Sequence, residues 1–186
     1  MSCFVTRHFM YCVMNCIQIC SLCSLSQVKF TCCCAVFSVN SQFQILLGAV
    51  SNYLTKQLCI SKKAHLILPT HRILDAAYEA AKGSARIGTT GKGIGPTYTD
   101  KVSRNGMRVG DVLSADFEKI YARAKARHEK ILRGLAYEYD ITELEQKWFA
   151  AVEYLRRFNI IDSEYFVNEC LAADKSILAE GAQGTL

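Results

Sequence analysis

All 17 acidic residues of this 186-residue chain lie at or beyond Asp75, and this asymmetry limits which part can form an ordinary globular domain. Nine of the ten cysteines precede Asp75, and only Cys170 follows it. Globular domains usually carry charges of both signs on their surface. We therefore expect two parts. Residues 1–57 are a cysteine-rich segment with the composition of a non-native or disordered stretch, and residues 58–186 are a partial globular domain.

Two uncharged runs in the first part, 8–28 and 30–55, are long enough to cross a bilayer, but polar side chains interrupt both. Neither has the basic start, purely apolar stretch and small-residue cleavage site of a secretory signal. Cys20 and Cys23 form one CxxC pair, and no second pair follows at the spacing of a zinc finger. We expect neither a membrane segment nor a metal site here, and a cysteine-rich membrane or metal-associated protein stays a distant alternative.

The net charge of +5 is too small to indicate a nucleic-acid partner. Basic residues at 119, 123, 127 and 130 form a stripe that is typical of a solvated helix face. A modest excess of cations suits small anionic substrates equally well. We expect a cytoplasmic protein without a nucleic-acid interface.

Ordinary patterns of helices and strands begin after residue 57. A buried strand is predicted over 65–68, followed by a helix that Thr70 caps and Gly83 ends. The inner side of that helix is expected to hold Ile73, Ala76, Ala77, Ala80 and Ala81.

Three further helices and a late strand follow from the spacing of apolar residues. Helices are expected over 115–133, from 142 onward and over 163–171, and a buried strand over 176–179. Thr142 and Glu145 have the spacing of a capping box. Trp148 falls on the apolar stripe of its helix, so we expect it in the core rather than at a ligand. The stripes of the first two helices comprise Phe117, Ile120, Tyr121, Ala124, Ile131 and Leu132, and Leu144, Trp148, Val152 and Leu155.

Residues 88–96 contain four glycines and a proline, a composition that indicates a loop rather than a regular element. Backbone amides without side chains, the hydroxyls of Thr89 and Thr90 and the ammonium of Lys92 can together surround an oxyanion. The pattern predicts an anion-binding loop.

The glycine-rich segment continues into a longer motif. Gly93-Ile-Gly-Pro is followed by Tyr98, Lys101 and Arg104 at regular spacing, then by residues 106–111 and, after the late strand, 180–186. In this order the motifs resemble the adenylosuccinate synthetase family over residues 58–186. The resemblance implies an α/β fold, part of a larger parallel-sheet ligase fold that is helix-rich in this region. It also implies a GTP-dependent ligase that joins IMP and L-aspartate.

The resemblance also assigns roles to single residues. It implies that Thr90, Arg104 and Gln183 bind IMP, with Arg104 reaching the site of the neighbouring subunit in a homodimer. A planar guanidinium suits a phosphate, and an amide can donate to a developing oxyanion. It implies an electrostatic, catalytic role for Lys101. Supporting or interface positions are Arg108, Gly91, Gly93 and Gly95, and no metal ligand is expected among these residues.

The family's Mg²⁺ and GTP would need other ligands. The phosphate loop of the family, Gly-Asp-Glu-Gly-Lys-Gly-Lys, does not occur in residues 1–57, where Gly48 is the single glycine. We expect a chain that looks cut at both ends and has no ligase activity alone. A non-catalytic IMP-binding or dimerisation module is the open alternative.

Overall fold

A computed structural model describes the chain from residue 58 onward almost completely, together with three short strands before it. Side chains are described for residues 59–86, 88–175 and 177, and the backbone alone for 11–12, 29–31, 36–37 and 58. Of the predicted strand over 176–179 the structure describes residue 177 alone, and the candidate residue Gln183 lies outside the described residues.

Parallel strands form the base of the fold. β1 (Tyr11–Cys12), β2 (Lys29–Thr31), β4 (Leu58–Ser61) and β6 (Asn159–Ile161) make a sheet in the order β1-β2-β4-β6, and every neighbouring pair is parallel. β3 (Val36–Phe37) and β5 (His65–Leu66) form a second parallel pair. The predicted α/β class with a parallel sheet is confirmed.

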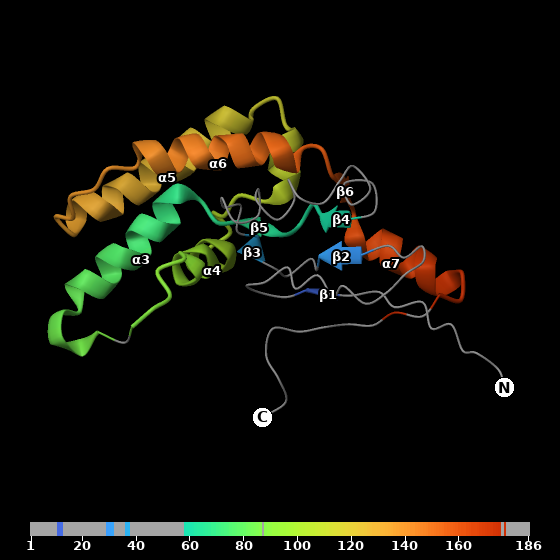
Figure 1. The fold of residues 1–186 in the computed structure, drawn as a ribbon, viewed down its shortest axis with the longest axis horizontal. Coiled ribbons are helices and arrows are strands. Elements are labelled where there is room, and N and C mark those ends of the chain that lie inside the picture. The colour runs from blue at the N-terminus through green and yellow to red at the C-terminus, as the bar shows by residue number, and fades with distance from the viewer. Residues whose placement is uncertain are drawn as a thin grey trace.

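Helices make up most of the remaining described chain. They are α3 (Pro69–Ala81), α4 (Ile94–Val102), α5 (Phe117–Gly134), α6 (Thr142–Leu155) and α7 (Ser163–Ala172), with short 3-10 turns η1 (Gly83–Ala85) and η2 (Val109–Leu113). In Figure 1, α5 and α6 run side by side above the strands, and α7 lies at the opposite end of the molecule from α3. None of the helices in the described part has both the length and the apolar character that a bilayer span requires.

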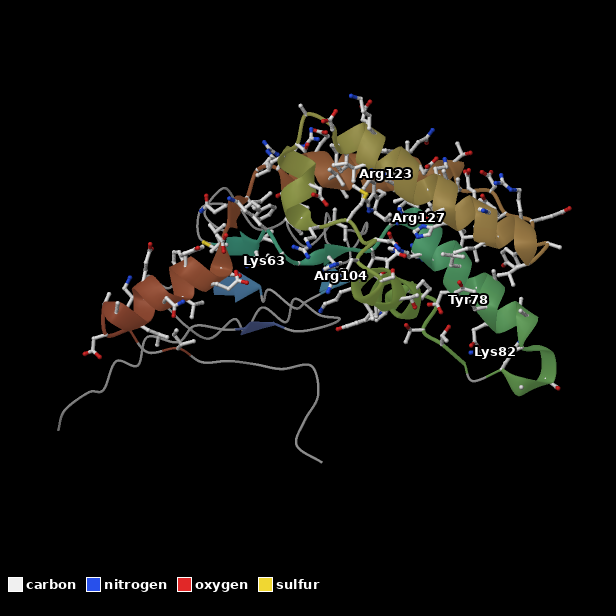
Figure 2. The ribbon with its side chains drawn as sticks, turned by 180° about the vertical axis from the view of Figure 1, so that it is seen from behind. Lys63, Tyr78, Lys82, Arg104, Arg123 and Arg127 are labelled. Carbon is white, nitrogen blue, oxygen red and sulfur yellow. The ribbon has the colours of Figure 1, made fainter. Side chains whose placement is uncertain are left out.

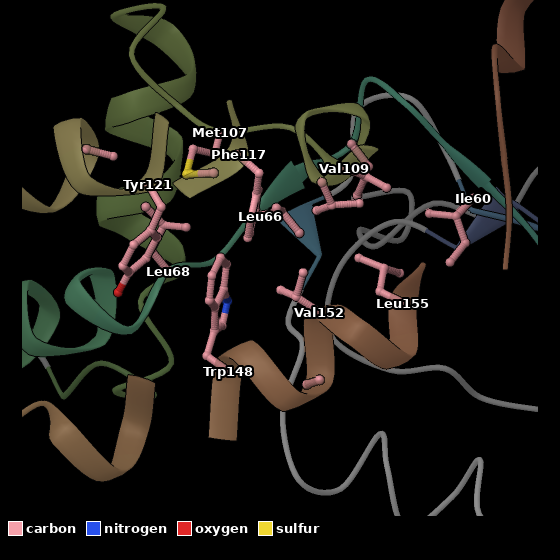
Figure 3. Close-up of a cluster of buried hydrophobic side chains, with 14 of the residues drawn as sticks. Ile60, Leu66, Leu68, Met107, Val109, Phe117, Tyr121, Trp148, Val152 and Leu155 are labelled. Carbon is pink, nitrogen blue, oxygen red and sulfur yellow. The ribbon is translucent and has the colours of Figure 1, made fainter. Parts of the chain in front are cut away.

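The main core lies between α5, α6 and the strands. Phe117 and Tyr121 of α5 stack on Trp148 of α6, with ring centroids 5.9 and 4.9 Å apart. The indole N–H of Trp148 donates to the carbonyl oxygen of Ile67 at 2.9 Å, so the single tryptophan joins α6 to the end of β5. Figure 3 shows these rings against Leu66, Leu68 and Val152. The prediction that Trp148 is a core residue is confirmed.

Both predicted helix caps are wrong. Thr70 is the second residue of α3, and its hydroxyl lies 2.6 Å from Nδ1 of His128 instead. Thr142 is the first residue of α6, where Asp140 accepts its backbone N–H at 2.9 Å. Glu145 accepts from Tyr121 and Lys125 of α5, both at 2.6 Å, and so links two helices.

Two further expectations need correction. Ala76, Ala80 and Ala81 of α3 are exposed, because the helix turns its polar residues His71 and Asp75 inward with Leu74 and Ala77. Ile131 of α5 is exposed as well. The loop predicted over 88–96 ends earlier than expected, since α4 begins at Ile94. Pro96 is tolerated there because the first turn of a helix needs no N–H donor.

Candidate functional site

The glycine-rich loop leads into α4 through left-handed backbone. Gly88, Gly91 and Gly93 have φ values of +79°, +63° and +78°, a region that side chains other than glycine rarely adopt. Gly93 is buried against α3. A Cβ atom there would lie 2.8 Å from the backbone nitrogen of Arg72 and 2.9 Å from the carbonyl carbon of His71. At Gly93 glycine is therefore required both by conformation and by space.

Replacing Gly93 with alanine is expected to lower the free energy of unfolding by about 2–5 kcal/mol, the sum of left-handed strain and overpacking. Urea unfolding followed by the fluorescence of Trp148 measures this loss. Gly91→Ala is the matched control, since Gly91 shares the left-handed φ but no atom lies within 4 Å of its added Cβ. The control should lose only about 1–2 kcal/mol. Equal losses for the two variants would contradict the close approach at Gly93.

Thr90 and Arg104 lie beyond the two ends of α4. Thr90 is exposed in the loop before the N-cap residue Gly93, and Arg104 is exposed just after the last residue, Val102. Figure 2 shows Arg104 near the middle of the molecule, away from Lys82 and the segment that leads from α3 to α4. Nine helical residues span about 13 Å, so the length of α4 separates the loop that carries Thr90 from the turn that carries Arg104.

Arg104 occupies an unusual backbone conformation. Its φ of +60° is left-handed, although arginine has a Cβ that disfavours this region. The following turn holds it there, because the backbone N–H groups of Asn105 and Gly106 both donate to the carbonyl oxygen of Asp100, at 2.9 and 3.0 Å. The guanidinium therefore extends from a turn that is closed by hydrogen bonds.

Lys101 and Arg108 flank a buried histidine. Burial lowers the pKa of His65, and the positive charges of Arg108 and Lys101 lower it further, against an opposite effect of Asp111. The backbone of His65 forms an antiparallel bridge with Arg108. The ammonium of Lys101 also lies 5.3 Å from the centre of the Tyr98 ring. Lys101, Arg104 and Arg108 therefore give the C-terminal end of α4 and the segment after it a small excess of positive charge over Asp100 and Asp111, which suits an anionic ligand.

A buried polar network that we did not predict joins α3, α4 and α5. Oδ2 of Asp100 lies 3.1 Å from Nε2 of His71 and 3.0 Å from Nε2 of His128. Both rings are almost fully buried. Thr70 and Thr97 contact the Nδ1 atoms of His128 and His71, at 2.6 and 2.9 Å. We call these five residues the histidine–aspartate network.

The sequence did contain a signal for this network. His71 lies at helical spacing from the apolar residue Leu74 and from Asp75, on the inner face of α3. On α5, His128 lies four residues from each of the buried residues Ala124 and Leu132. Titratable side chains on a buried stripe are rarely left without partners. The partner, Asp100, lies 28 and 29 residues away along the chain, so spacing alone does not identify it.

Hydrogen bonds determine the protonation state of His71. The backbone N–H of Leu68 donates to its Nδ1 at 3.0 Å, and an amide can only donate. We infer the tautomer with hydrogen on Nε2, which donates to the carboxylate of Asp100. Burial would raise the pKa of Asp100, but hydrogen bonds from His128 and His71 outweigh it and hold this pKa well below its usual range. Asp100 is therefore ionised.

The same three groups have the composition of a metal site, with ligand atoms within 4.8 Å of one another. A histidine that binds a metal uses a nitrogen lone pair and keeps hydrogen on the other nitrogen. In His71 the only lone pair already accepts the amide of Leu68. This donor set therefore fits hydrogen bonding to Asp100 and not a metal ion.

Sequence comparison identifies the family of this fold and site. The sequence profile of adenylosuccinate synthetases matches residues 36–186. The chain belongs to the adenylosuccinate synthetase family. Adenylosuccinate synthetase of Parabacteroides distasonis is 70% identical over 140 residues, 75% of this chain and 33% of the relative. That of Bacteroides fragilis strain YCH46 is 69% identical over the same length and covers the same shares.

A solved structure supports the same assignment. Fully ligated adenylosuccinate synthetase from Plasmodium falciparum superposes with a TM-score of 0.72 at 28% identity, covering 85% of this chain and 37% of that chain. The chain spans about a third of the length of the curated synthetases it matches, 33% for the Parabacteroides protein. The resemblance drawn from the motifs is confirmed, and the roles of the single site residues remain predictions.

Proposed function

We propose that the protein serves the GTP-dependent joining of IMP and L-aspartate into adenylosuccinate, in the cytoplasm. In this reaction the γ-phosphoryl group of GTP moves to the purine oxygen of IMP, and the aspartate nitrogen then displaces phosphate. The family relationship supports the activity. The cationic end of α4 supports a dianionic substrate. IMP is such a substrate, because it carries a phosphate group.

The observation that carries this proposal is the position of Thr90 and Arg104 at opposite ends of α4. If both bind the phosphate of IMP, the length of α4 favours contributions from two copies of the chain. In a dimer with two-fold symmetry, the N-terminal end of α4 in each subunit can lie next to the C-terminal end of α4 in the other subunit. Such a dimer has two equivalent sites. We therefore propose a homodimer in which Arg104 completes the IMP site of the neighbouring subunit.

Each remaining candidate has a role in the proposed site. Lys101 stabilises negative charge that develops during transfer, Gln183 donates its amide near the reacting base, and Arg108 supports the shared boundary. Gly91 and Gly95 leave the loop and the first turn of α4 open, since no atom lies within 4 Å of a Cβ at either position. The backbone amide of Gly91, which donates to the hydroxyl of Thr89 at 3.4 Å, lies in this open loop where an anion can reach it.

The candidate site residues Lys101, Arg104 and Arg108 do not fit Mg²⁺. This ion prefers oxygen ligands, above all carboxylates, whereas Lys101, Arg104 and Arg108 are cations. Asp111, the nearby carboxylate, already accepts the backbone N–H of Arg108 at 2.7 Å. We therefore assign neither the ion nor the guanine nucleotide to any residue of the described part.

The test is to measure binding and turnover with the chain itself. We expect calorimetry to show binding of IMP and at least tenfold weaker binding of inosine, which lacks the phosphate. We expect no adenylosuccinate from IMP, GTP and aspartate, because residues 1–57 contain no phosphate loop. Equal affinity for inosine and IMP would contradict the phosphate site, and turnover would contradict the expected inactivity.

A non-catalytic IMP-binding or dimerisation module is the second candidate. The missing phosphate loop favours it for this chain in isolation. One experiment separates the two candidates. Adding the remaining segments of a synthetase to the chain should restore turnover if the chain is part of the catalytic protein, and should not if it is a non-catalytic module.

A further inference from the structure

The two ends of α4 are held by one connected set of buried polar groups. At the N-terminal end, the N–H of Gly93 donates to Oδ2 of Asp75 in α3 at 2.9 Å. The hydroxyl of Thr97 lies 2.7 Å from the carbonyl oxygen of Gly93 and 2.9 Å from Nδ1 of His71. The hydrogen bond from Gly93 to Asp75 therefore fixes the turn that follows Thr90 to α3, and the hydroxyl of Thr97 lies against the ring of His71 beside it.

The C-terminal end is held by α5. Asp100 binds His128 through its side chain, and its carbonyl oxygen accepts the two amides that close the turn around Arg104. Arg127 donates to the carbonyl oxygen of Asn105 at 2.7 Å and lies 3.5 Å from Oδ2 of Asp100. Asp100 thus takes part in both the histidine–aspartate network and the turn that carries Arg104.

The network costs free energy that apolar packing would avoid. An ionised carboxylate and two imidazole rings are buried between three helices, and replacing such groups by apolar side chains is often neutral or stabilising. What hydrogen bonds add is a defined geometry, because they fix distance and direction where apolar contacts allow sliding. A shared binding site needs this, since it tolerates displacements of only about 0.5 Å.

We propose that His71, Asp100 and His128 are positioning residues of the IMP site. Asp100 joins α4 to α3 through His71 and to α5 through His128, and with the Gly93–Asp75 hydrogen bond these contacts fix the separation and orientation of the Thr90 loop and the Arg104 turn. A dimer can place these two elements on one phosphate only if each subunit presents them at a constant distance. The inference rests on the proposed IMP site and adds the groups that hold its two halves.

The test is amide hydrogen exchange of the full chain by NMR, in the wild type and in Asp100→Asn. We expect exchange to become at least tenfold faster at Gly93 and at Gly106, relative to the amide of Val152 in the core of α6. Asp116→Asn is the matched control, since Asp116 is an exposed carboxylate paired with Lys119. This control should leave the exchange rates of all three amides unchanged. A uniform increase at all three, or none at Gly93 and Gly106, would overturn the proposal.

Two further measurements keep the test decisive if Asp100→Asn does not fold. Asp75→Ala should speed exchange at Gly93 but not at Gly106, because it removes the acceptor of the Gly93 amide and leaves the contacts of Asp100 in place. In the wild type, ring ¹⁵N spectra should show His71 with hydrogen on Nε2. Hydrogen on Nδ1 instead, or equal exchange of both glycines in Asp75→Ala, would contradict the proposed arrangement.

IMP titration separates this proposal from the proposed function. If the wild type binds IMP and Asp100→Asn speeds amide exchange at both Gly93 and Gly106, the affinity of the variant for IMP should fall at least tenfold. An unchanged affinity of Asp100→Asn for IMP, together with faster exchange at both glycines, would overturn the positioning role and leave the proposed function standing. Failure of the wild type to bind IMP would instead count against the proposed function, and the exchange result would still decide whether the network holds both ends of α4.

Discussion

Replacing Asp100 with alanine is expected to lower the free energy of unfolding by about 3–5 kcal/mol, the usual cost of removing one partner from a buried charged pair. The loss is large because the variant leaves the Nε2–H groups of His71 and His128 buried without their acceptor. Domains of this size are stable by only about 5–15 kcal/mol in total. This single substitution would therefore remove a large share of the stability.

Urea unfolding followed by the fluorescence of Trp148 measures the effect, because this single tryptophan lies in the main core. Asp116→Ala is the control, since its ion pair with Lys119 is exposed and such pairs contribute about 0–1 kcal/mol. A loss below about 1 kcal/mol for Asp100→Ala would contradict the buried, ionised state inferred for the carboxylate.

Arg104→Ala is expected to weaken IMP binding by about 10- to 100-fold, which is what one charge-assisted hydrogen bond of about 1.5–3 kcal/mol contributes. Alanine keeps the Cβ atom, so the left-handed backbone at φ +60° carries a similar cost in both proteins. The change in affinity therefore reports the guanidinium and not a relaxed turn. Calorimetric titration with IMP measures it.

Arg123→Ala is the matched control, because Arg123 is an exposed arginine on α5. Figure 2 shows it apart from Arg104. Arg104→Lys keeps the charge but loses the planar fork, so its affinity should fall between those of the wild type and the alanine variant. Equal affinities for Arg104→Ala and Arg123→Ala would remove Arg104 from the site.

Local patterns predicted the elements of this fold well. Apolar residues at helical spacing gave the positions of α5, α6 and α7, and they placed Trp148 in the core. Gly83 with φ +55° follows α3 as expected. These features depend on residues a few positions apart, which is the range in which helix and turn propensities act.

Contacts between distant segments were not predictable in the same way. Thr70 and Glu145 have the residue types and positions of capping groups, yet their side chains bind His128 and Tyr121 on another helix. The exposed alanines of α3 show the same limit. Their spacing suits a buried face, but the polar residues His71 and Asp75 face inward because Asp100, His128 and Gly93 supply their partners.

The candidate site shows both cases. The glycine motif predicted the loop, and three of its glycines do adopt left-handed backbone. It did not reveal that α4 begins at Ile94 and separates Thr90 from Arg104. That separation leads to the proposed requirement for two copies of the chain.

Mixing two defective variants tests this requirement most directly. Thr90→Asp and Arg104→Ala chains should each bind IMP poorly, and an equimolar mixture that has exchanged subunits should recover about a quarter of the wild-type sites, since half of the dimers are mixed and each has one intact site. Calorimetry with IMP, with sedimentation to confirm the dimer, counts these sites. A mixture that recovers no sites while forming mixed dimers would contradict an IMP site shared between Thr90 of one subunit and Arg104 of the other.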